Sequence, residues 1–284
     1  RMTVLKVSGL CKSYSGFELK KVALSLEKGR IMGFIGRNGA GKTTTMKSLV
    51  NFIHPDAGRI EFFGLSFAEH ERGIKERIGF VSGGAEFYPR SKLRAITDVS
   101  RAFYRNWDEK SYRENLKRFS LDENKTPAQL SAGMKVKYAL TLALSHHAEL
   151  LLLDEPTSGL DPVSRDDLLD EFLHLSRDEA ISILFSTHIT SDLDKCADDI
   201  SYLRAGRIAD SGMLEDFVKA YRTVSFDDAE LKEEQKKLLI GIKRAKHGQT
   251  ALVRLDDVEK LGVETQPADL ENIMIHLERE GEEC

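Results

Sequence analysis

The stretch "GRNGAGKT", residues 36–43, decides the fold class of this chain. It fits the pattern G-x-x-x-x-G-K-[ST], in which the glycines let the backbone curl until successive N–H groups face a phosphate. A buried strand, "RIMGFI", is predicted before it and a helix, "KTTTMKSLVNFI", after it, which is the context that such a loop requires. Lys42 is expected to reach the β- and γ-phosphates of a nucleotide, and the hydroxyl of Thr43 to hold Mg²⁺. The residues predicted to bind nucleotide here are Gly36, Arg37, Asn38, Gly39, Ala40, Gly41, Lys42, Thr43 and Thr44.

A second apolar segment, "LLLLDE" at residues 150–155, places two carboxylates at the exit of a predicted buried strand. Alone, acids at a strand end are normally solvated and idle. Beside a phosphate-binding loop, Asp154 is of the right chemical class to hold Mg²⁺, and Glu155 to orient or deprotonate an attacking water. Consecutive side chains at a strand end point different ways, so this adjacent pair can perform two tasks.

The next predicted buried strand, "ISILFSTH" at residues 181–188, ends in His188. A lone histidine at a strand end is more often structural than functional. Its position after Asp154 and Glu155 favours the functional interpretation here, in which the imidazole contacts a γ-phosphate.

The rest of the chain is organised around these motifs. Alternating apolar and polar residues over 2–30 indicate strands with one buried face, and 87–147 is mostly helical in pattern. Strands and helices then alternate, with a helix at about 163–176, which implies a parallel sheet with helical crossovers. The character changes near residue 220, and residues 221–284 are predicted to form a small accessory domain. The apolar face of its last helix consists of Leu270, Ile273 and Leu277.

Composition narrows the function classes. Net charge is −4 and the pI about 6.1, so no nucleic-acid partner is expected. The widely separated Cys11, Cys196 and Cys284 predict no disulfide framework, and the adjacent His146 and His147 are interpreted as a solvated helix-end pair rather than a metal site.

No apolar run approaches the ~20 residues that cross a bilayer, and no signal-peptide pattern is present. A cytoplasmic location is expected.

Taken in order, these motifs resemble the nucleotide-binding subunits of ABC transporters over residues 3–215. "GRNGAGKT" is similar to their Walker A loop, "LSAGM" at 130–134 to their signature motif, and "LLLLDEP" to Walker B. "SGLD" at 158–161 resembles the D-loop and "STH" at 186–188 the switch histidine. Tyr14 matches the aromatic position that stacks on adenine in this family.

The resemblance implies an α/β fold, a P-loop NTPase of the ABC type. It has a mixed central sheet, an N-terminal antiparallel β subdomain and a helical subdomain at about 87–147. The ABC ATPase domain is expected over residues 2–220 and a small α+β domain over 221–284. ATP and Mg²⁺ are the implied ligands. The implied catalytic residues are Glu155, His188 and Lys42, and the implied metal-binding ones are Thr43 and Asp154.

In ABC ATPases two subunits meet head to tail, and each ATP lies between the P-loop of one and the signature helix of the other. By this resemblance Ser131 and Gly133 would grip the γ-phosphate bound to the partner, and Asp161 would belong to the same nucleotide site. A helix N-terminus stabilises an anion by ~0.3–1 kcal/mol when exposed. That gain requires ATP in the interface, so nucleotide can control association with a second copy or a related subunit.

The sequence also departs from the family pattern. Ala132 and Met134 replace the commoner Gly and Gln of the signature, and variants with Met resemble bacterial export-type subunits, including the antibiotic-peptide resistance group. Gly83 stands where a glutamine normally touches Mg²⁺ or the attacking water. Ser82 or Glu86 could substitute for that glutamine, or a water could fill the space.

The expected function is ATP hydrolysis that drives transport, export rather than import, through a separate transmembrane permease. The chain would then be peripheral on the inner face of the cell membrane. The permease is expected to dock near residues 83–90, where Phe87 and Tyr88 are either exposed docking aromatics or core residues. Two alternatives stay open: a regulatory module that binds ATP and barely hydrolyses it, and a soluble ABC ATPase without a membrane partner.

Overall fold

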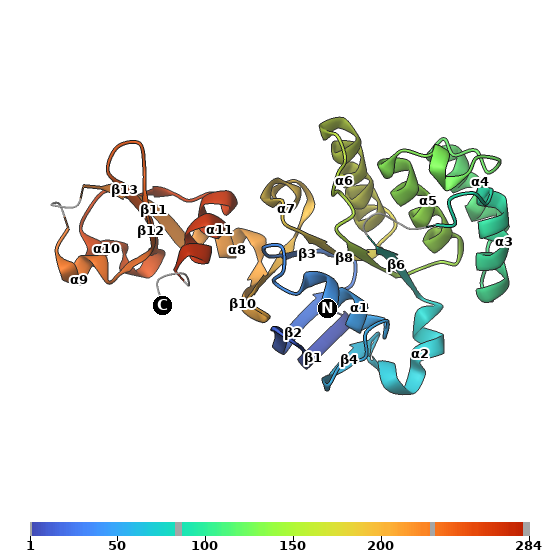
Figure 1. The fold of residues 1–284 in the computed structure, drawn as a ribbon, viewed down its shortest axis with the longest axis horizontal. Helices are drawn as coiled ribbons and strands as arrows, with labels where there is room; N and C mark the ends of the chain where they lie inside the picture. Colours follow the sequence, from blue (N-terminus) through green and yellow to red (C-terminus); the bar gives the residue numbers. More distant parts are fainter. Residues whose placement is uncertain (1, 83–86, 228–230, 281–284) are drawn as a thin grey trace. The chain divides into compact units, whose positions relative to one another are not determined.

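The computed structural model describes residues 2–82, 87–227 and 231–280 (Figure 1). The chain divides into two compact units, residues 1–210 and 211–284. The first unit contains two sheets and the second unit one, and each unit has its own hydrophobic core. The predicted domain limits at 220 and 221 stay predictions.

The first unit begins with an antiparallel sheet of order β2-β1-β4-β5. Buried and exposed residues alternate along most of β2, as the period-two pattern predicts. The alternation is broken in β1 by register shifts between Val7 and Leu10 and between Leu10 and Lys12, which are the irregularities of β-bulges. The strands are β1 (Thr3–Tyr14), β2 (Phe17–Glu27), β4 (Ala57–Phe62) and β5 (Leu65–Ser66).

A six-stranded sheet of order β10-β9-β3-β8-β7-β6 forms the centre of this unit. The pairs β9/β3, β3/β8, β8/β7 and β7/β6 are parallel. Only two residues, Ala205 and Gly206, connect β9 to β10, and both have positive φ, which suits a tight antiparallel hairpin. The sheet is therefore mixed. Its strands are β3 (Ile31–Ile35), β6 (Ile78–Ser82), β7 (Leu150–Asp154), β8 (Ser182–Thr187), β9 (Asp199–Arg204) and β10 (Arg207–Met213).

Helices cover both faces of the central sheet. In Figure 1, α6 and α7 lie above it and α1 lies below it, and all three contact its strands. Because β3, β7 and β8 are parallel, their carboxyl ends meet at one edge, where the residues of the candidate site follow each strand. The helices are α1 (Lys42–Leu49), α2 (Phe67–Lys75), α6 (Pro162–Arg177) and α7 (Thr190–Cys196).

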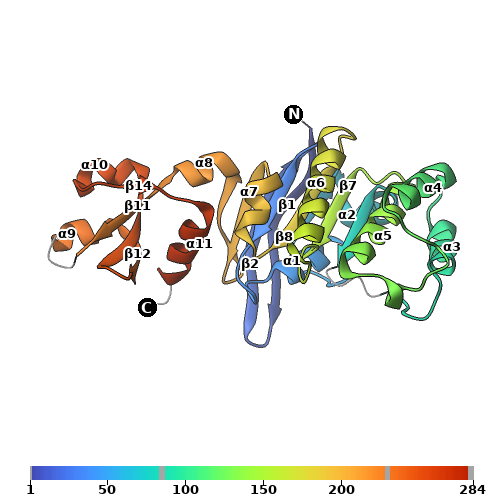
Figure 2. The same ribbon diagram turned by 90° about the horizontal axis from the view of Figure 1, so that it is seen from above.

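A separate group of helices lies at the β6 edge of the central sheet (Figures 1 and 2). A buried network joins its members: Thr97 Oγ1 lies 3.0 Å from the hydroxyl of Tyr112 and 2.8 Å from that of Tyr138. The Tyr138 hydroxyl is also 2.9 Å from the carbonyl oxygen of Leu93. The members are α3 (Leu93–Phe103), α4 (Glu109–Arg118), the 3₁₀ turn η1 (Pro127–Gln129) and α5 (Ala132–Ser145). The helical subdomain of the expected fold class is thus present.

The second unit contains an antiparallel sheet of order β12-β13-β11-β14 with α9 between β11 and β12 and α10 between β13 and β14. This is the split βαβ arrangement of ferredoxin-like domains, a refinement of the expected α+β class. The final helix α11 buries its predicted apolar face, Leu270, Ile273 and Leu277. The elements are α8 (Leu214–Lys219), β11 (Tyr221–Phe226), α9 (Glu233–Lys236), β12 (Leu239–Arg244), β13 (Gln249–Arg254), η2 (Leu255–Asp257), α10 (Val258–Leu261), β14 (Gln266–Pro267) and α11 (Leu270–Arg279).

Candidate functional site

The loop of residues 36–43 connects β3 to α1. Gly41 has a φ of 110°, and a Cβ there would lie 2.6 Å from a side-chain atom of Leu19. A Cβ on Gly36 would lie 2.3 Å from the carbonyl oxygen of Leu203. Left-handed backbone at one glycine and a close backbone approach at the other explain why neither position accommodates a side chain.

Lys42 is the first residue of α1, and only 5% of it is exposed. Its Nζ donates hydrogen bonds to the carbonyl oxygens of Gly36, at 2.7 Å, and Arg37, at 3.2 Å. The same atom lies 3.1 Å from Oε1 of Glu155. The loop therefore curls around the ammonium group, whose oxygen partners are of the kind that phosphate oxygens can replace.

Asp154 ends β7 and is buried. Its Oδ1 accepts hydrogen bonds from the hydroxyls of Thr43, at 3.2 Å, and Ser186, at 2.7 Å. The Ser186 oxygen also accepts a hydrogen bond from the backbone N–H of Glu155, at 2.9 Å. Asp154 and Ser186 are paired across β7 and β8, so the sheet register sets the contact with Ser186, while the start of α1 brings Thr43 to the same oxygen.

Glu155 is the residue at which the chain leaves β7, and its φ is 50°. Such backbone in a residue other than glycine costs on the order of 1–3 kcal/mol and is found mainly where the structure enforces it. The carboxylate Oε2 lies 2.9 Å from Nδ1 of His188, while Oε1 faces Lys42. One carboxylate thus bridges the lysine of the P-loop and the histidine at the end of β8.

The structure brings together all five residues predicted for catalysis and metal binding, although they are up to 146 positions apart in the sequence, from Lys42 to His188. In the rest of the loop, Arg37, Asn38 and Gly39 are exposed, Thr44 is half-buried and Ala40 is buried. Their assignment to nucleotide binding stays a prediction.

Tyr14 ends β1 with 46% of its surface exposed, so its ring is accessible for stacking. The ammonium of Lys12 lies 5.5 Å from the ring centroid and 2.8 Å from Oδ1 of Asp56. Asp56 also accepts a hydrogen bond from the backbone N–H of Ser13, at 2.7 Å. These hydrogen bonds, from Lys12 above all, hold the pKa of the Asp56 carboxyl below its usual range.

The predicted signature residues lie elsewhere in the first unit. Ser131 is the N-cap of α5, and its hydroxyl accepts a hydrogen bond from the N–H of Met134 at 3.2 Å. Within the described residues, no hydrogen bond or ion pair joins Ser131 to the P-loop, and Figure 1 shows α5 apart from α1. A Cβ on Gly133 would meet Ser164 at 3.7 Å and Leu160 at 3.8 Å, which is ordinary contact. The chain's own packing therefore leaves room for a side chain at Gly133.

Asp161 caps α6, and its Oδ1 accepts hydrogen bonds from the N–H groups of Val163, at 3.1 Å, and Ser164, at 3.0 Å. Hydrogen bonding to the side chain of Ser164, and to both backbone N–H groups, lowers the pKa of this carboxyl. The residue is exposed. It thus begins a helix at the surface, next to the start of α5.

Sequence reasoning did not identify two residues that organise the site. Ser186 holds both Asp154 and the backbone of Glu155, although it belongs to the motif "STH" that was assigned for its histidine alone. Asp192, in α7, is fully buried and contacts the loop after β7 through Thr157 and the last residue of β8, Thr187. No sequence signal distinguished it from the solvated acids around it.

The sequence places Gly83 where the family has a glutamine, with Ser82 and Glu86 as possible substitutes. Gly83 lies outside the described residues, as does Glu86. Ser82 ends β6 and pairs with Asp154 across the sheet, so it adjoins the candidate metal-binding carboxylate.

Two other expectations concern the helical group. Tyr88 is 79% exposed, whereas Phe87 packs edge-on against Tyr138 with ring centroids 5.0 Å apart. The interpretation of the two adjacent histidines as a solvated pair is wrong for His146. This ring is buried and stacks on Tyr104 with centroids 3.7 Å apart, while His147 is exposed.

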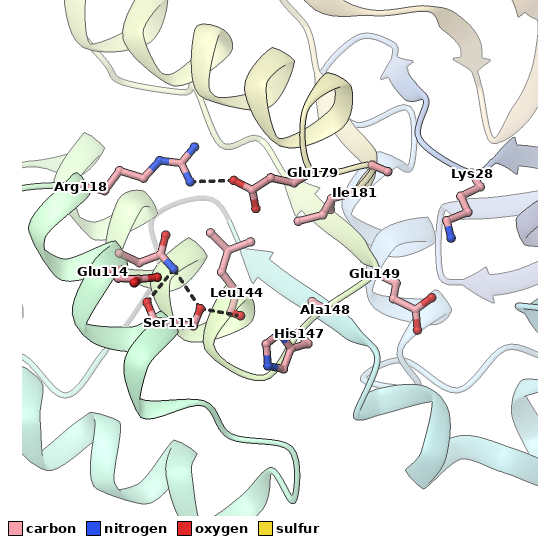
Figure 3. Close-up of a pocket in the computed structure, with 12 residues that line it drawn as sticks. Lys28, Ser111, Glu114, Arg118, Leu144, His147, Ala148, Glu149, Glu179 and Ile181 are labelled. Carbon is pink, nitrogen blue, oxygen red and sulfur yellow. Dashed lines mark hydrogen bonds and ion pairs between the residues drawn. The ribbon is translucent and has the colours of Figure 1, made fainter.

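A pocket of about 680 Å³ lies away from the predicted nucleotide-site residues, between α4, the turn after α5 and the turn before β8 (Figure 3). Charges of both signs line it, with Lys28 and Arg118 set against Glu149 and Glu179. Arg118 already donates to Glu179 at 2.9 Å. The pocket contains none of the predicted nucleotide-site residues, and its mixed charges, which include Glu114, select no ligand class.

Fold and loop geometry define a P-loop nucleotide-binding protein with an added helical subdomain. The model of the family described as ABC transporter matches residues 19–158. The ABC transporter ATP-binding protein YtrB of Bacillus subtilis (strain 168) is 31% identical over 219 residues, which cover 77% of this chain and 75% of YtrB. The bacitracin transport ATP-binding protein BcrA of Bacillus licheniformis is 32% identical over 209 residues, which cover 72% of this chain and 68% of BcrA.

Solved structures agree in fold. An ATP-binding subunit of an ABC transporter is 28% identical, with a TM-score of 0.67 over 75% of this chain and 91% of its own. A dimeric ATP-binding cassette in a post-hydrolysis state, bound to ADP and Pi, is 23% identical. Its TM-score is 0.65, over 74% of this chain and 98% of the cassette. The chain therefore belongs to the ABC transporter family, as an ATP-binding subunit of the ATPase type.

Proposed function

We propose that this chain is the motor subunit of an export-type ABC transporter and that Glu155 activates the water that attacks ATP. The observation that carries the proposal is the position of the Glu155 carboxylate, 3.1 Å from Lys42 Nζ and 2.9 Å from His188 Nδ1. A γ-phosphate that binds Lys42 would compete with Glu155 for the ammonium. Glu155 would then be released from the lysine and could face the attacking water.

Lys42 and His188 would stabilise the charge that develops on the transferred phosphoryl group. Lys42 lies next to one oxygen of the Glu155 carboxylate, Oε1, and His188 next to the other, Oε2. Positioned donors of this kind act before the reaction and need little rearrangement during it. Hydrolysis, rather than ATP binding alone, is the task that uses a carboxylate and a histidine in this arrangement.

Thr43 and Asp154 are the residues that would hold Mg²⁺. Their oxygens lie 3.2 Å apart, and an alcohol plus a carboxylate, completed by phosphate oxygens and water, is a ligand set that Mg²⁺ prefers. The hydroxyl of Ser186, which donates a hydrogen bond to Oδ1 of Asp154, would fix the orientation of that carboxylate. When bound, the ion would neutralise charge on the phosphates.

Ser131 and Gly133 are proposed to bind the ATP of a second cassette, in a head-to-tail dimer with another copy or a related subunit. The proposal is supported by the room for a Cβ at Gly133, since the chain's own packing gives no reason for a glycine there. A phosphate that approaches the backbone closely at this helix N-terminus would give one, because only glycine leaves that space free. Asp161 begins the neighbouring helix and would lie in the same interface.

An apolar groove of about 290 Å³ between β6, α3 and α5 is the proposed docking site for a short helix of a transmembrane permease. Phe52, Phe80 and Phe87 line it. Tyr88 and Phe103 are sequence neighbours of two lining residues, Phe87 and Tyr104, and are 79% and 75% exposed. Large exposed apolar groups next to an apolar groove indicate a partner surface.

Transport and location follow from the same proposal. Within the described ranges, none of the helices combines the length and apolarity needed to span a membrane, and a separate permease would supply that part. The chain would work at the inner face of the cell membrane. Export is proposed from Met134 in the signature motif, and a bacitracin transport protein, BcrA, is among the relatives.

The test is steady-state ATP hydrolysis by the unmodified chain and by Glu155→Gln. We expect the variant to lose on the order of 100-fold or more in kcat, as removal of a general base can cost, while it still binds ATP. Glu149→Gln is the matched control, because Glu149 precedes the same strand at its opposite end and pairs with Arg77. Equal activity of Glu155→Gln and the unmodified chain would contradict the proposal.

A further inference from the structure

The carboxylate of Asp192, in α7, has no exposed surface. Its Oδ2 accepts hydrogen bonds from the hydroxyls of Thr157, at 2.6 Å, and Thr187, at 3.1 Å. Its Oδ1 accepts one from Nε of Arg165. A second guanidinium nitrogen of Arg165 donates to Ser191 at 2.6 Å. Both carboxylate oxygens are therefore occupied by donors from other parts of the chain.

Burial of a carboxylate is unfavourable unless it is paired and hydrogen-bonded, and an apolar group of similar size often serves stability as well or better. Among the described residues, Arg165 is the one basic side chain that forms an ion pair with Asp192. Its place in the core therefore calls for a reason other than stability. The identity of its three donors supplies one.

Each donor adjoins a residue of the proposed site. Thr157 is two positions after Glu155. Thr187 directly precedes His188, and its hydroxyl also accepts a hydrogen bond from the N–H of Ile189, at 3.0 Å, so it holds the backbone on both sides of the histidine.

The third donor leads to the D-loop. The N–H of Arg165 donates to the carbonyl oxygen of Asp161 at 2.9 Å, in the first turn of α6. Asp192 thus contacts the turn after the general base, the residue before the histidine, and the helix that begins with Asp161. Asp192 thereby adds a second connection between the first two segments, which the contact of Glu155 with His188 also joins.

We propose that Asp192 is a positioning residue for ATP hydrolysis, which fixes the loops of Glu155, His188 and Asp161 in one geometry. This inference rests on the proposed function of those residues. Misplacement of a reacting group by about 1 Å can lower a rate by 10²-fold. Asp192 acts through its neighbours, and among the described residues its side chain makes no hydrogen bond or ion pair to the P-loop, so we expect it to affect catalysis rather than ATP binding.

The test uses substitutions that keep size and change hydrogen bonding. Asp192→Asn replaces one acceptor oxygen with an NH₂ group, which cannot accept from Arg165 or from the threonines. Thr187→Val removes one donor without change of shape, and Thr187→Ser restores the hydroxyl. The control is Asp198→Asn, because Asp198 pairs with Arg177 at the other end of α6 and has no contact with these loops.

We expect Asp192→Asn and Thr187→Val to lower kcat by roughly 10- to 100-fold, with KM and the Kd for ATP within about threefold of the unmodified chain. Thr187→Ser and Asp198→Asn should keep kcat. Folded Asp192→Asn with unchanged kcat overturns the inference, as does Thr187→Val with the activity of Thr187→Ser. Should Asp192→Asn fail to fold, the two Thr187 variants decide. Failure of the proposed function is seen separately, as retained activity in Glu155→Gln.

Discussion

Gly133 is the residue at which the chain's own stability and its proposed function make opposite demands. A Cβ there meets only Ser164 and Leu160, at ordinary distances. Because glycine within a helix is less stable than alanine by roughly 0.5–1 kcal/mol, Gly133→Ala should leave the free energy of unfolding unchanged or raise it. ATP hydrolysis should nevertheless fall on the order of 10-fold or more, as when a donor to a transition-state oxyanion is lost.

Chemical denaturation and ATPase rates of the same Gly133→Ala preparation test this expectation. Gly41→Ala provides the contrast, because it combines positive φ with a 2.6 Å clash and should lose both stability and ATP binding. Full activity in Gly133→Ala would remove the argument that this glycine faces a ligand.

The residues of the site were predictable from the sequence because their chemistry lies in the side chain and their spacing fits one family pattern. Lys42, Asp154 and Glu155 are of this kind. Ser186 and Asp192 were not predictable, since their roles arise from sheet register and burial. The positive φ of Glu155 is likewise a product of the assembled fold.

At the scale of elements, His146 joins three helices and is a titratable group inside that junction. It caps the end of α5, stacks on Tyr104 at the end of α3, and its Nδ1 donates to the carbonyl oxygen of Glu76 after α2, at 3.1 Å. Burial lowers its pKa to about 4. The imidazole is therefore neutral at pH 7, and protonation opposes the packing of these helices.

The sign of the pH effect follows from proton binding. An unfolded histidine takes up a proton below its usual pKa of about 6.5, whereas folded His146 does so only near pH 4. The free energy of unfolding should therefore fall as pH decreases from about 6.5 to about 4, by on the order of 2–3 kcal/mol from this group. His146→Phe keeps the stacked ring and should flatten this part of the curve.

Urea denaturation between pH 4 and pH 7 is the measurement. His147→Asn is the control, because His147 is exposed and has a φ of 59°, which asparagine tolerates. A pH dependence in His146→Phe equal to that of the unmodified chain would contradict the assignment.

The elements also show where pattern reasoning stops. The helix predicted over 42–53 ends at Leu49. Asn51 has a φ of 60°, and the N–H groups of Phe52 and Ile53 return to the carbonyl oxygen of Lys47. The apolar Phe52 suggested that the helix continued, but 64% of it is exposed. A tight C-terminal turn, rather than loss of periodicity, ended the helix.

At the scale of the whole chain, the two units have separate hydrophobic cores, so each is expected to unfold in its own transition. A Cβ on Gly241, in β12, would lie 1.8 Å from the carbonyl oxygen of His276 in α11, and the φ of Gly241 is 59°. Gly241→Ala should therefore displace α11 and destabilise the second unit. ATP binding by the first unit should be unchanged.

Calorimetry in the presence and absence of ATP separates the two units, because ATP stabilises only the unit that binds it. Gly262→Ala is the control, with a similar φ of 69° and no neighbour within 4 Å of its Cβ. If Gly241→Ala lowers the midpoint temperature of the ATP-sensitive transition as much as that of the transition of the second unit, the two units do not unfold independently.

The central claim is that one ATP is held between the P-loop of one cassette and the signature helix of another. Light scattering of Glu155→Gln with and without Mg-ATP tests it most directly, because loss of the proposed base should trap the ATP-bound assembly. The account predicts a mass of 31.9 kDa without nucleotide and twice that mass with Mg-ATP. A mass that stays at the monomer value while ATP is shown to be bound would contradict the claim for two copies of this chain.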